Sequence, residues 1–333
     1  MSKRLFLRAA SAVAAGAVLQ ACGGGGGSDD DGGAPLGSDT LLERLQQDGD
    51  FSLLLEATAR AGLESTLGAA GAALTLFAPT NSAFDALASR IGQSSGSTLV
   101  NALTPTQWAN ILKFALVPQT LPLTTLNTYA SNDTRPQTSY EFRGSAARLI
   151  FVRDNGMLTV WDGVGRTSIT LIDTDISASN GVMHVVSDML LPRGVLTVSQ
   201  MVRANIDSFS RFAASLTPSI IAELDGRNAC TVFVPSDALL AAPLTDTRAV
   251  RFHVATTTLG DDDFPTVNNS VTLSTLIGSN TTLTTRANLV IGGRSVLAQL
   301  TDATATPANL TDVDFYASNG VIHVLDKALV PQA

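Results

Sequence analysis

The pattern of apolar and polar positions predicts short strands and short helices. Apolar residues occur in brief runs that begin with or lie among Thr and Ser, such as residues 75–78 and 231–234, and this favours strands over long helices. Each of these two runs ends at a proline, which has no backbone N–H and so cannot donate a hydrogen bond to a neighbouring strand. Residues 182–186 carry apolar side chains on both alternating faces, with His184 among them, so we expect a strand buried on both faces. Residues 50–57 read as a helix.

The chain repeats itself over a long period. Residues 75–81 and residues 231–237 share the pattern Thr-apolar-Phe-apolar-Pro, followed by two polar residues. Residues 173–186 and residues 312–325 are identical at most positions, and both contain Asp-x-Asp and Asn-Gly-Val-x-His-Val. We call these two repeated segments the landmarks. Because both landmarks occur twice and in the same order, the sequence predicts two tandem domains, at residues 39–193 and 194–333.

Each landmark predicts a local structure. Thr80 and Asn81, and Ser236 and Asp237, are residue types that cap the start of a helix, so we expect a helix after each of these strands. Ser82-x-x-Asp85 resembles a capping box. The Asn-Gly pairs predict tight hairpin turns of the type in which both central residues have positive φ.

Both landmarks are closely similar to the two signature segments of fasciclin domains. The resemblance covers residues 40–333 and implies an α+β fold, with each domain a wedge-shaped β-sandwich carrying several short, mostly N-terminal helices. It also implies a role in cell adhesion or matrix association. The motif residues, to which we assign structural roles, are Phe77, Pro79, Thr80, Asn81, Asn180, Gly181, His184, Phe233, Pro235, Asn319, Gly320 and His323.

Fasciclin domains often carry a Tyr-His pair between the two signatures, linked to partner binding in animal members. The matching residues are Phe114-Ala115 in the first copy and Phe252-His253 in the second. A histidine beside an aromatic ring suits an interface anchor, so Phe252 and His253 are the candidate partner-binding residues. In the alternative interpretation Phe252 lies in the core and His253 bonds a nearby carbonyl.

The N-terminus has the layout of an export signal. A basic start is followed by a short apolar run and then Leu19-Gln20-Ala21-Cys22, which resembles a bacterial lipoprotein box. We therefore expect a signal peptide at residues 1–21, a lipidated Cys22 that anchors the chain to a membrane, and a flexible Gly/Asp tether at residues 22–38. The alternative is an ordinary secretory signal with a chance cysteine. The residue after the cysteine is Gly23 and not Asp, which resembles the signal for outer-membrane sorting in Gram-negative lipoproteins. We therefore expect the protein at the outer membrane or cell surface, with the periplasmic face as the alternative location.

The charge excludes one class of partner. The full chain has a net charge of −8, and the predicted signal segment contains only basic charges, so the mature chain is more acidic still. An acidic surface repels nucleic acid. The expected partners are a membrane through Cys22, and a surface protein, matrix polymer or glycan.

Candidate metal and thiol chemistry has structural alternatives. His184 and His323 fall at one repeated position in predicted buried strands, so we interpret them as core residues and not as metal ligands or catalysts. The pairs Asp173/Asp175 and Asp312/Asp314 fit turn hydrogen bonding better than calcium, which needs six to eight oxygens. The run Asp261–Asp263 fits a solvated loop, with a weak cation site as the alternative. Cys230 fits a small buried residue at the start of a strand. We predict no metal and no cofactor.

One motif raises the possibility of an enzyme. Gly92-Gln-Ser94-Ser-Gly96 matches the nucleophile-elbow pattern, but that motif needs a preceding strand and here a helix is predicted before it. The sequence therefore predicts an adhesion or binding protein and not an enzyme. The alternatives are a lipoprotein that binds a small molecule and, less favoured, a hydrolase built on Ser94 or a carboxylate pair.

Overall fold

The computed structural model describes residues 38–332, except residues 155, 167–168, 266–268, 292–293 and 305. These described residues form one compact unit. The predicted signal peptide, Cys22 and the tether up to residue 37 lie outside the described residues.

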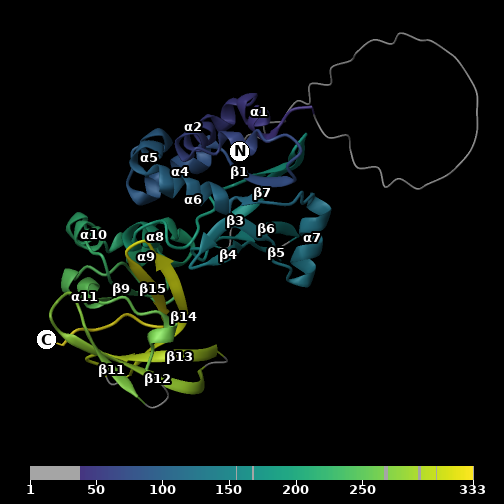
Figure 1. Cartoon of the computed structure of the whole chain (residues 1–333). Coiled ribbons are helices and arrows are strands. Elements are labelled where there is room, and N and C mark those ends of the chain that lie inside the picture. Colours follow the sequence, from purple (N-terminus) through teal and green to yellow (C-terminus); the bar gives the residue numbers. More distant parts are fainter. Residues whose placement is uncertain are drawn as a thin grey trace, which may run out of the picture. The chain divides into compact units, whose positions relative to one another are not determined.

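The first repeat begins with helices and ends with strands (Figure 1). The helical elements are α1 (Leu41–Gln46), η1 (Gly49–Phe51), α2 (Ser52–Ala61), α3 (Glu64–Leu67), α4 (Asn81–Ile91), α5 (Gly96–Ala102), α6 (Pro105–Phe114) and α7 (Leu123–Asn132). The strands are β1 (Leu74–Pro79), β2 (Leu116–Val117), β3 (Gln137–Phe142), β4 (Ser145–Arg148), β5 (Ile150–Asp154), β6 (Met157–Trp161), β7 (Ile169–Ala178) and β8 (Gly181–Val186).

The second repeat follows the same plan. Its helical elements are α8 (Val198–Ala204), α9 (Ile206–Ala214), α10 (Pro218–Asp225), α11 (Thr247–Phe252) and η2 (Asp261–Asp263). Its strands are β9 (Thr231–Pro235), β10 (Val254–Ala255), β11 (Ser270–Ser274), β12 (Asn280–Ile291), β13 (Arg294–Thr301), β14 (Ala308–Ala317) and β15 (Gly320–Leu325). Helices precede most of the strands in both repeats, and the predicted α+β class is confirmed.

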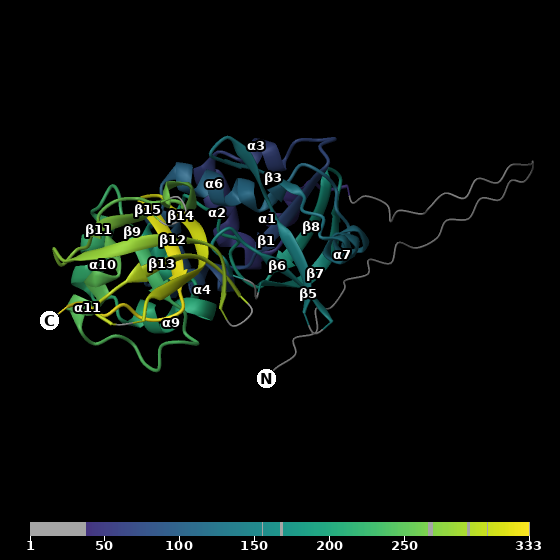
Figure 2. The same cartoon turned by 90° about the horizontal axis from the view of Figure 1, so that it is seen from below.

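The two landmarks of each repeat are neighbouring parallel strands. The described strands form sheets of order β2-β1-β8-β7-β6-β5 and β10-β9-β15-β14-β13-β12-β11, and β3 pairs with β4 (Figure 2). β1 runs parallel to β8 and β9 runs parallel to β15, each at the centre of its domain. Every residue of these four strands is buried. The repeated sequence therefore codes for a repeated parallel pair in the core, with β8 and β15 buried on both faces as predicted.

The hairpins between β7 and β8 and between β14 and β15 differ from the predicted turn. Ala178 pairs with Gly181, so the two central residues are Ser179 and Asn180, and neither has positive φ. The glycine is needed for a different reason, which is the close approach of β1. A Cβ on Gly181 would lie 2.0 Å from the carbonyl oxygen of Leu74. The prediction of a two-residue hairpin was right, whereas its type and its central residues were wrong.

The predicted helix caps after β1 and β9 are also corrected. Thr80 is the N-cap residue of α4, but its side chain makes no capping hydrogen bond. Asp85, the second half of the proposed capping box, instead accepts a hydrogen bond from the backbone N–H of Gly96 at 2.7 Å. After β9 the residues Ser236 and Asp237 begin a turn and not a helix.

Candidate functional site

The repeated asparagines of the hairpins hold the N-terminal helices onto the sheet. Asn180 is fully buried; its Oδ1 accepts from the backbone N–H of Leu41 at 2.8 Å, and its Nδ2 donates to the carbonyls of Leu67 and Ala69. Asn319 makes the equivalent bonds, from Val198 and to Leu224 and Arg227. Each asparagine therefore satisfies backbone groups at helix ends that have no partner within their own helix.

The polar residues after β1 and β9 have a related role. Asn81 Oδ1 accepts from the backbone N–H of Leu53 at the start of α2, at 2.9 Å. The carboxylate of Asp237 accepts from the backbone N–H groups of Ser210 and Arg211, both at 2.8 Å, in the part of α9 that follows its kink at Phe209. Asn81 and Asp237 therefore bond the N–H groups of a helix that precedes the strand, and not those of the following helix as predicted.

The two motif histidines are neutral hydrogen-bonded core residues. His184 and His323 are fully buried, and each stacks on the phenylalanine of the neighbouring parallel strand, Phe77 or Phe233. Nε2 of His323 donates to the carbonyl of Leu259 at 2.7 Å, and its Nδ1 accepts from the backbone N–H of Asp314. Burial lowers the pKa of His184, and it lowers the pKa of His323 to about 4. This arrangement fits the predicted structural role.

The candidate partner-binding residues Phe252 and His253 lie inside the fold. Phe252 is 2% exposed and packs in the second domain's core, and His253 is fully buried. Nδ1 of His253 donates to the carbonyl of Ala249 at 2.9 Å, and Nε2 accepts from the backbone N–H of Leu329. Burial lowers the pKa of His253 to about 4. The alternative interpretation therefore holds, and neither residue is on a surface that a partner reaches. Phe114 and Ala115, at the end of α6, are buried in the same way.

The remaining sequence candidates also make structural contacts. Asp175 and Asp314 have positive φ within β-bulges, and their carboxylates accept from the backbone N–H groups of Leu123 and Asp261. Within the described residues, no three His, Cys, Asp or Glu side chains are grouped so that they could hold a metal ion. Cys230 is free and buried immediately before β9, and burial raises the pKa of its thiol to about 11.

Ser94 lies in the turn between α4 and α5, after a helix and not after a strand. Its hydroxyl contacts Thr98 Oγ1 at 3.3 Å, and Gly92 ends α4 in the left-handed conformation. The next residue, Ser95, is the N-cap of α5 and forms a capping box with Thr98. Turn and capping chemistry therefore account for the Gly-x-Ser-x-Gly match.

One face of strands β5 to β7 carries an exposed apolar surface. Met157 is 59% exposed, Ile172 is 57% exposed and Trp161 is 37% exposed. Directly opposed residues of antiparallel strands share a face, and Ile150 is opposite Trp161, so Ile150 belongs to the same surface. Met157, Thr159 and Trp161 share it by the two-residue period of β6. Thr170 is opposite Thr159, so Ile172, two residues further along β7, lies on the same face. We call Ile150, Val152, Met157, Trp161 and Ile172 the outer face.

The opposite face of these strands packs into the core of the first domain. Phe151 and Val160 are buried there, and Phe151 contacts the ring of Phe77. α7 lies against β5. Of the six exposed large hydrophobic side chains in the described part of the chain, three belong to the outer face. Their exposure is therefore concentrated on one side of one sheet.

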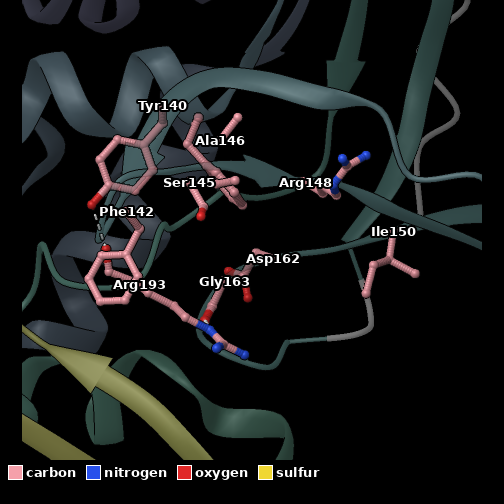
Figure 3. Close-up of a pocket in the computed structure, with 11 residues that line it drawn as sticks. Tyr140, Phe142, Ser145, Ala146, Arg148, Ile150, Asp162, Gly163 and Arg193 are labelled. Atoms are coloured by element: carbon pink, nitrogen blue, oxygen red, sulfur yellow. Dashed lines mark hydrogen bonds between the residues drawn. The ribbon is translucent and has the colours of Figure 1, made fainter.

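A groove of about 310 Å³ adjoins the outer face at Ile150. It lies between the β3–β4 hairpin and the loop that follows β6, and Figure 3 shows its aromatic and basic side chains. The lining residues are Phe114, Tyr140, Phe142, Ser145, Ala146, Ala147, Arg148, Ile150, Asp162, Gly163 and Arg193. The Tyr140 hydroxyl donates to the carbonyl of Arg193 at 2.8 Å, and burial raises the pKa of Tyr140.

The single carboxylate among the groove's lining residues is already bound. The side chain of Asp162 is fully buried, and its carboxylate accepts from Arg166 Nε at 2.9 Å and from the backbone N–H groups of Val164 and Arg166. Arg166, 2% exposed, also pairs with Asp188 at 3.0 Å. These bonds fix the loop that forms one wall of the groove.

Sequence reasoning missed both the outer face and the groove. A signal for the outer face was available, because Met157-Leu-Thr-Val-Trp161 has large apolar residues at alternate positions on both sides of β6. The groove had no local signal, since its residues come from α6, β3, β4, β5 and the segments after β6 and β8.

The family is shown by comparison with known domains. The model of the fasciclin domain matches residues 49–192 and 207–331, so the chain belongs to the fasciclin family and contains two of these domains in tandem. The curated proteins gave no match. Among solved structures, a FAS1 domain pair from the insect cell adhesion molecule Fasciclin I is similar at 17% sequence identity, with a TM-score of 0.39, over 87% of this chain and 95% of that chain.

The described residues contain no helix that has both the length and the apolar character needed to span a bilayer.

Proposed function

We propose that this chain is a membrane-anchored binding protein of the cell envelope, which adheres to a surface protein or matrix polymer through the outer face of its first domain. Fasciclin domains are known in cell adhesion proteins. The observation that carries the proposal is the exposure of Met157, Trp161 and Ile172 together on one sheet face. Contiguous apolar surface on a folded domain commonly marks an interaction site.

The first domain is a better candidate for the partner-binding surface than the second domain. Its candidate anchors, Phe252 and His253, are buried, whereas the first domain presents a tryptophan and a methionine, residue types that are enriched in interfaces. Anchoring through a lipidated Cys22 and export to the envelope rest on the N-terminal sequence. A flexible tether of the length predicted for residues 22–38 leaves the domains free to reorient toward a partner.

The test is a binding assay with the full chain against envelope fractions and immobilised matrix polymers. The variant Met157→Ser/Trp161→Ser/Ile172→Ser removes apolar area from the outer face, and we expect retention to fall at least about tenfold, a loss equal to about 1.4 kcal/mol. The matched control is Leu239→Ser/Val330→Ser, which alters exposed apolar residues of the second domain. Retention of the triple variant equal to that of the parent, with an unchanged melting temperature, would contradict the proposal.

A further inference from the structure

The groove beside the outer face has a basic rim on an acidic protein. Arg148 and Arg193 line it and are exposed, and within the described residues neither forms an ion pair with a carboxylate. Their hydrogen bonds go to backbone carbonyls: Arg148 Nη1 to Arg135 at 2.8 Å and Arg193 Nε to Gly163 at 3.2 Å. Each guanidinium therefore keeps donors available for an incoming anion.

No free carboxylate among the groove's lining residues opposes these two cations. Asp162 is the acidic residue of the lining, and its charge is compensated by Arg166. A third exposed arginine, Arg143, lies at the tip of the β3–β4 hairpin, 4.8 Å from the centre of the Tyr316 ring. Outside the lining, Asp314 is near enough to Arg193 to interact with it: burial raises the pKa of the Asp314 carboxyl to about 6, and Arg193 lowers it. Arg148 and Arg193 therefore form a basic rim with one carboxylate beside it, on a chain with a net charge of −8.

The rest of the lining is apolar or small. Phe142, Ala146 and Ile150 provide apolar surface, and Ser145 provides a hydroxyl. Figure 3 shows the guanidinium groups of Arg148 and Arg193 on different sides of the groove, and not converging on one point. Cations placed apart suit a ligand with several spaced negative charges, whereas a single small anion needs donors that converge.

The groove continues onto the outer face. Ile150 lines the groove and is directly opposite Trp161 in the β5–β6 pair, so Trp161 is on the strand next to the groove's end. Trp161 combines a large flat apolar surface with a polar N–H. Sugar rings also have apolar C–H faces and polar edges, and such a ring suits this side chain and Phe142.

We propose that this groove, with Trp161 beyond it, binds an acidic glycan whose carboxylates pair with Arg148 and Arg193. Arginine suits this role because its planar fork binds carboxylates through two parallel hydrogen bonds. The proposal rests on the proposed function, since it names the matrix polymer that the first domain would bind. A volume of about 310 Å³ is at the lower end for ligand sites, and it suits a ring or two of a longer chain lying across an open groove.

Two other kinds of anionic partner fit the groove less well. The groove has apolar lining residues, but a volume of about 310 Å³ is too small to enclose the two acyl chains of an anionic lipid. An acidic peptide would satisfy the arginines, but it has no need for a flat ring such as Trp161 beside them. Both become outcomes of the test.

The experiment measures binding of the full chain to polygalacturonate, to its neutral methyl ester, to polyglutamate and to phosphatidylglycerol vesicles. We expect polygalacturonate to bind, the methyl ester to bind at least about tenfold more weakly, and the affinity to fall as salt screens the charges. The variant Arg148→Gln/Arg193→Gln should bind polygalacturonate at least about tenfold more weakly. The control Lys113→Gln/Arg248→Gln, which removes the same charge elsewhere, should bind like the parent.

A second variant removes no charge. Ser145 is exposed at the groove, so Ser145→Tyr fills the groove without disturbing the core, and it should also weaken polygalacturonate binding. Equal binding of the acidic polymer and its methyl ester, or no effect of the arginine variant, would overturn the proposal. So would arginine-dependent binding to polyglutamate or to vesicles that is as tight as binding to polygalacturonate.

The glycan-binding proposal and the proposed adhesive role of the outer face can be refuted independently of each other. If the chain binds none of these probes but the Met157/Trp161/Ile172 variant loses retention of envelope material, the glycan proposal is wrong and the adhesive face stands. If polygalacturonate binds through the arginines while that variant is retained like the parent, the adhesive role of the outer face is wrong.

Discussion

At the scale of single residues, the polar members of the repeated motifs hold backbone groups and do not form a reactive site. Asn180 and Asn319 bond the ends of helices, and His184 and His323 bridge backbone groups between elements. The sequence predicted that the histidines are buried, because each lies in a strand whose other residues are apolar on both faces. The asparagine contacts were not predictable, since Asn180 bonds residues more than 100 positions away in the chain.

The first prediction concerns Asn180. Asn180→Ala leaves a backbone N–H and two carbonyls without their partner in a buried site, so we expect the free energy of unfolding to fall by about 3 kcal/mol. Urea denaturation followed by circular dichroism measures this change. Asn101→Ala, on the exposed side of α5, is the control and should change the value by less than about 0.5 kcal/mol. Equal effects of the two substitutions would show that the Asn180 hydrogen bonds do not hold the N-terminal helices onto the sheet.

The second prediction is a loss of stability in acid. The pKa of His253 and that of His323 fall from the ordinary value of 6.5 to about 4 on folding. The folded state therefore binds fewer protons than the unfolded state between these values. The stability that these histidines contribute is complete above pH 6.5 and is lost as the pH falls toward 4, by up to about 1.4 kcal/mol per pH unit for each histidine.

The measurement compares the parent with His323→Gln by urea denaturation from pH 7 to pH 4. Glutamine keeps one donor and one acceptor but does not titrate, so the variant should lose less stability over this range. Identical slopes for the parent and the variant would show that His323 does not titrate as its buried site requires.

At the scale of elements, the sequence predicted strands and their order but not their exact neighbours. Pro79 and Pro235 end β1 and β9 as expected, and the hairpins fall where Asn-Gly indicated. Ser236-Asp237 predicts a helix start wrongly because capping residues are the same types whether they cap the next helix or an earlier one. The parallel pairing of β1 with β8 was not foreseen, since it joins strands about 100 residues apart.

The third prediction tests that pairing. Gly181→Ala places a methyl group 2.0 Å from the Leu74 carbonyl oxygen, and backbone atoms of a central strand cannot move away cheaply. We expect a loss of about 3 kcal/mol or more in the free energy of unfolding. Gly49→Ala is the control, because nothing lies within 4 Å of the added carbon and Gly49 is not among the positive-φ glycines. Normal stability of Gly181→Ala would mean that β1 and β8 do not approach as closely as described.

At the scale of the whole molecule, the two domains share a scaffold and differ in the surfaces built on it. The family and the tandem arrangement followed from short motifs because those motifs form the core. The outer face and the groove did not follow, because surface positions are free of the packing constraints that make a motif recognisable. The sequence drew attention to Phe252 and His253, whereas the exposed aromatic residue of interest is Trp161.

The fourth prediction concerns the N-terminus and rests on sequence alone. Cys22→Ser removes the proposed lipidation site, so the protein should move from the membrane fraction to the soluble fraction or remain unprocessed. Cell fractionation with immunoblotting measures the change, and mass spectrometry of the parent should find acyl chains on Cys22. An unmodified mature N-terminus at another residue would contradict the lipoprotein prediction.

The most direct test of the central claim is hydrogen–deuterium exchange of the full chain with and without the envelope or polymer fraction that retains it. We expect binding to slow exchange in residues 150–161 and 169–172 of the first domain. Exchange around Phe252 and His253, which are already buried, should not change. Protection confined to the second domain, with residues 150–161 unaffected, would contradict the claim that the outer face of β5 to β7 is the adhesive surface.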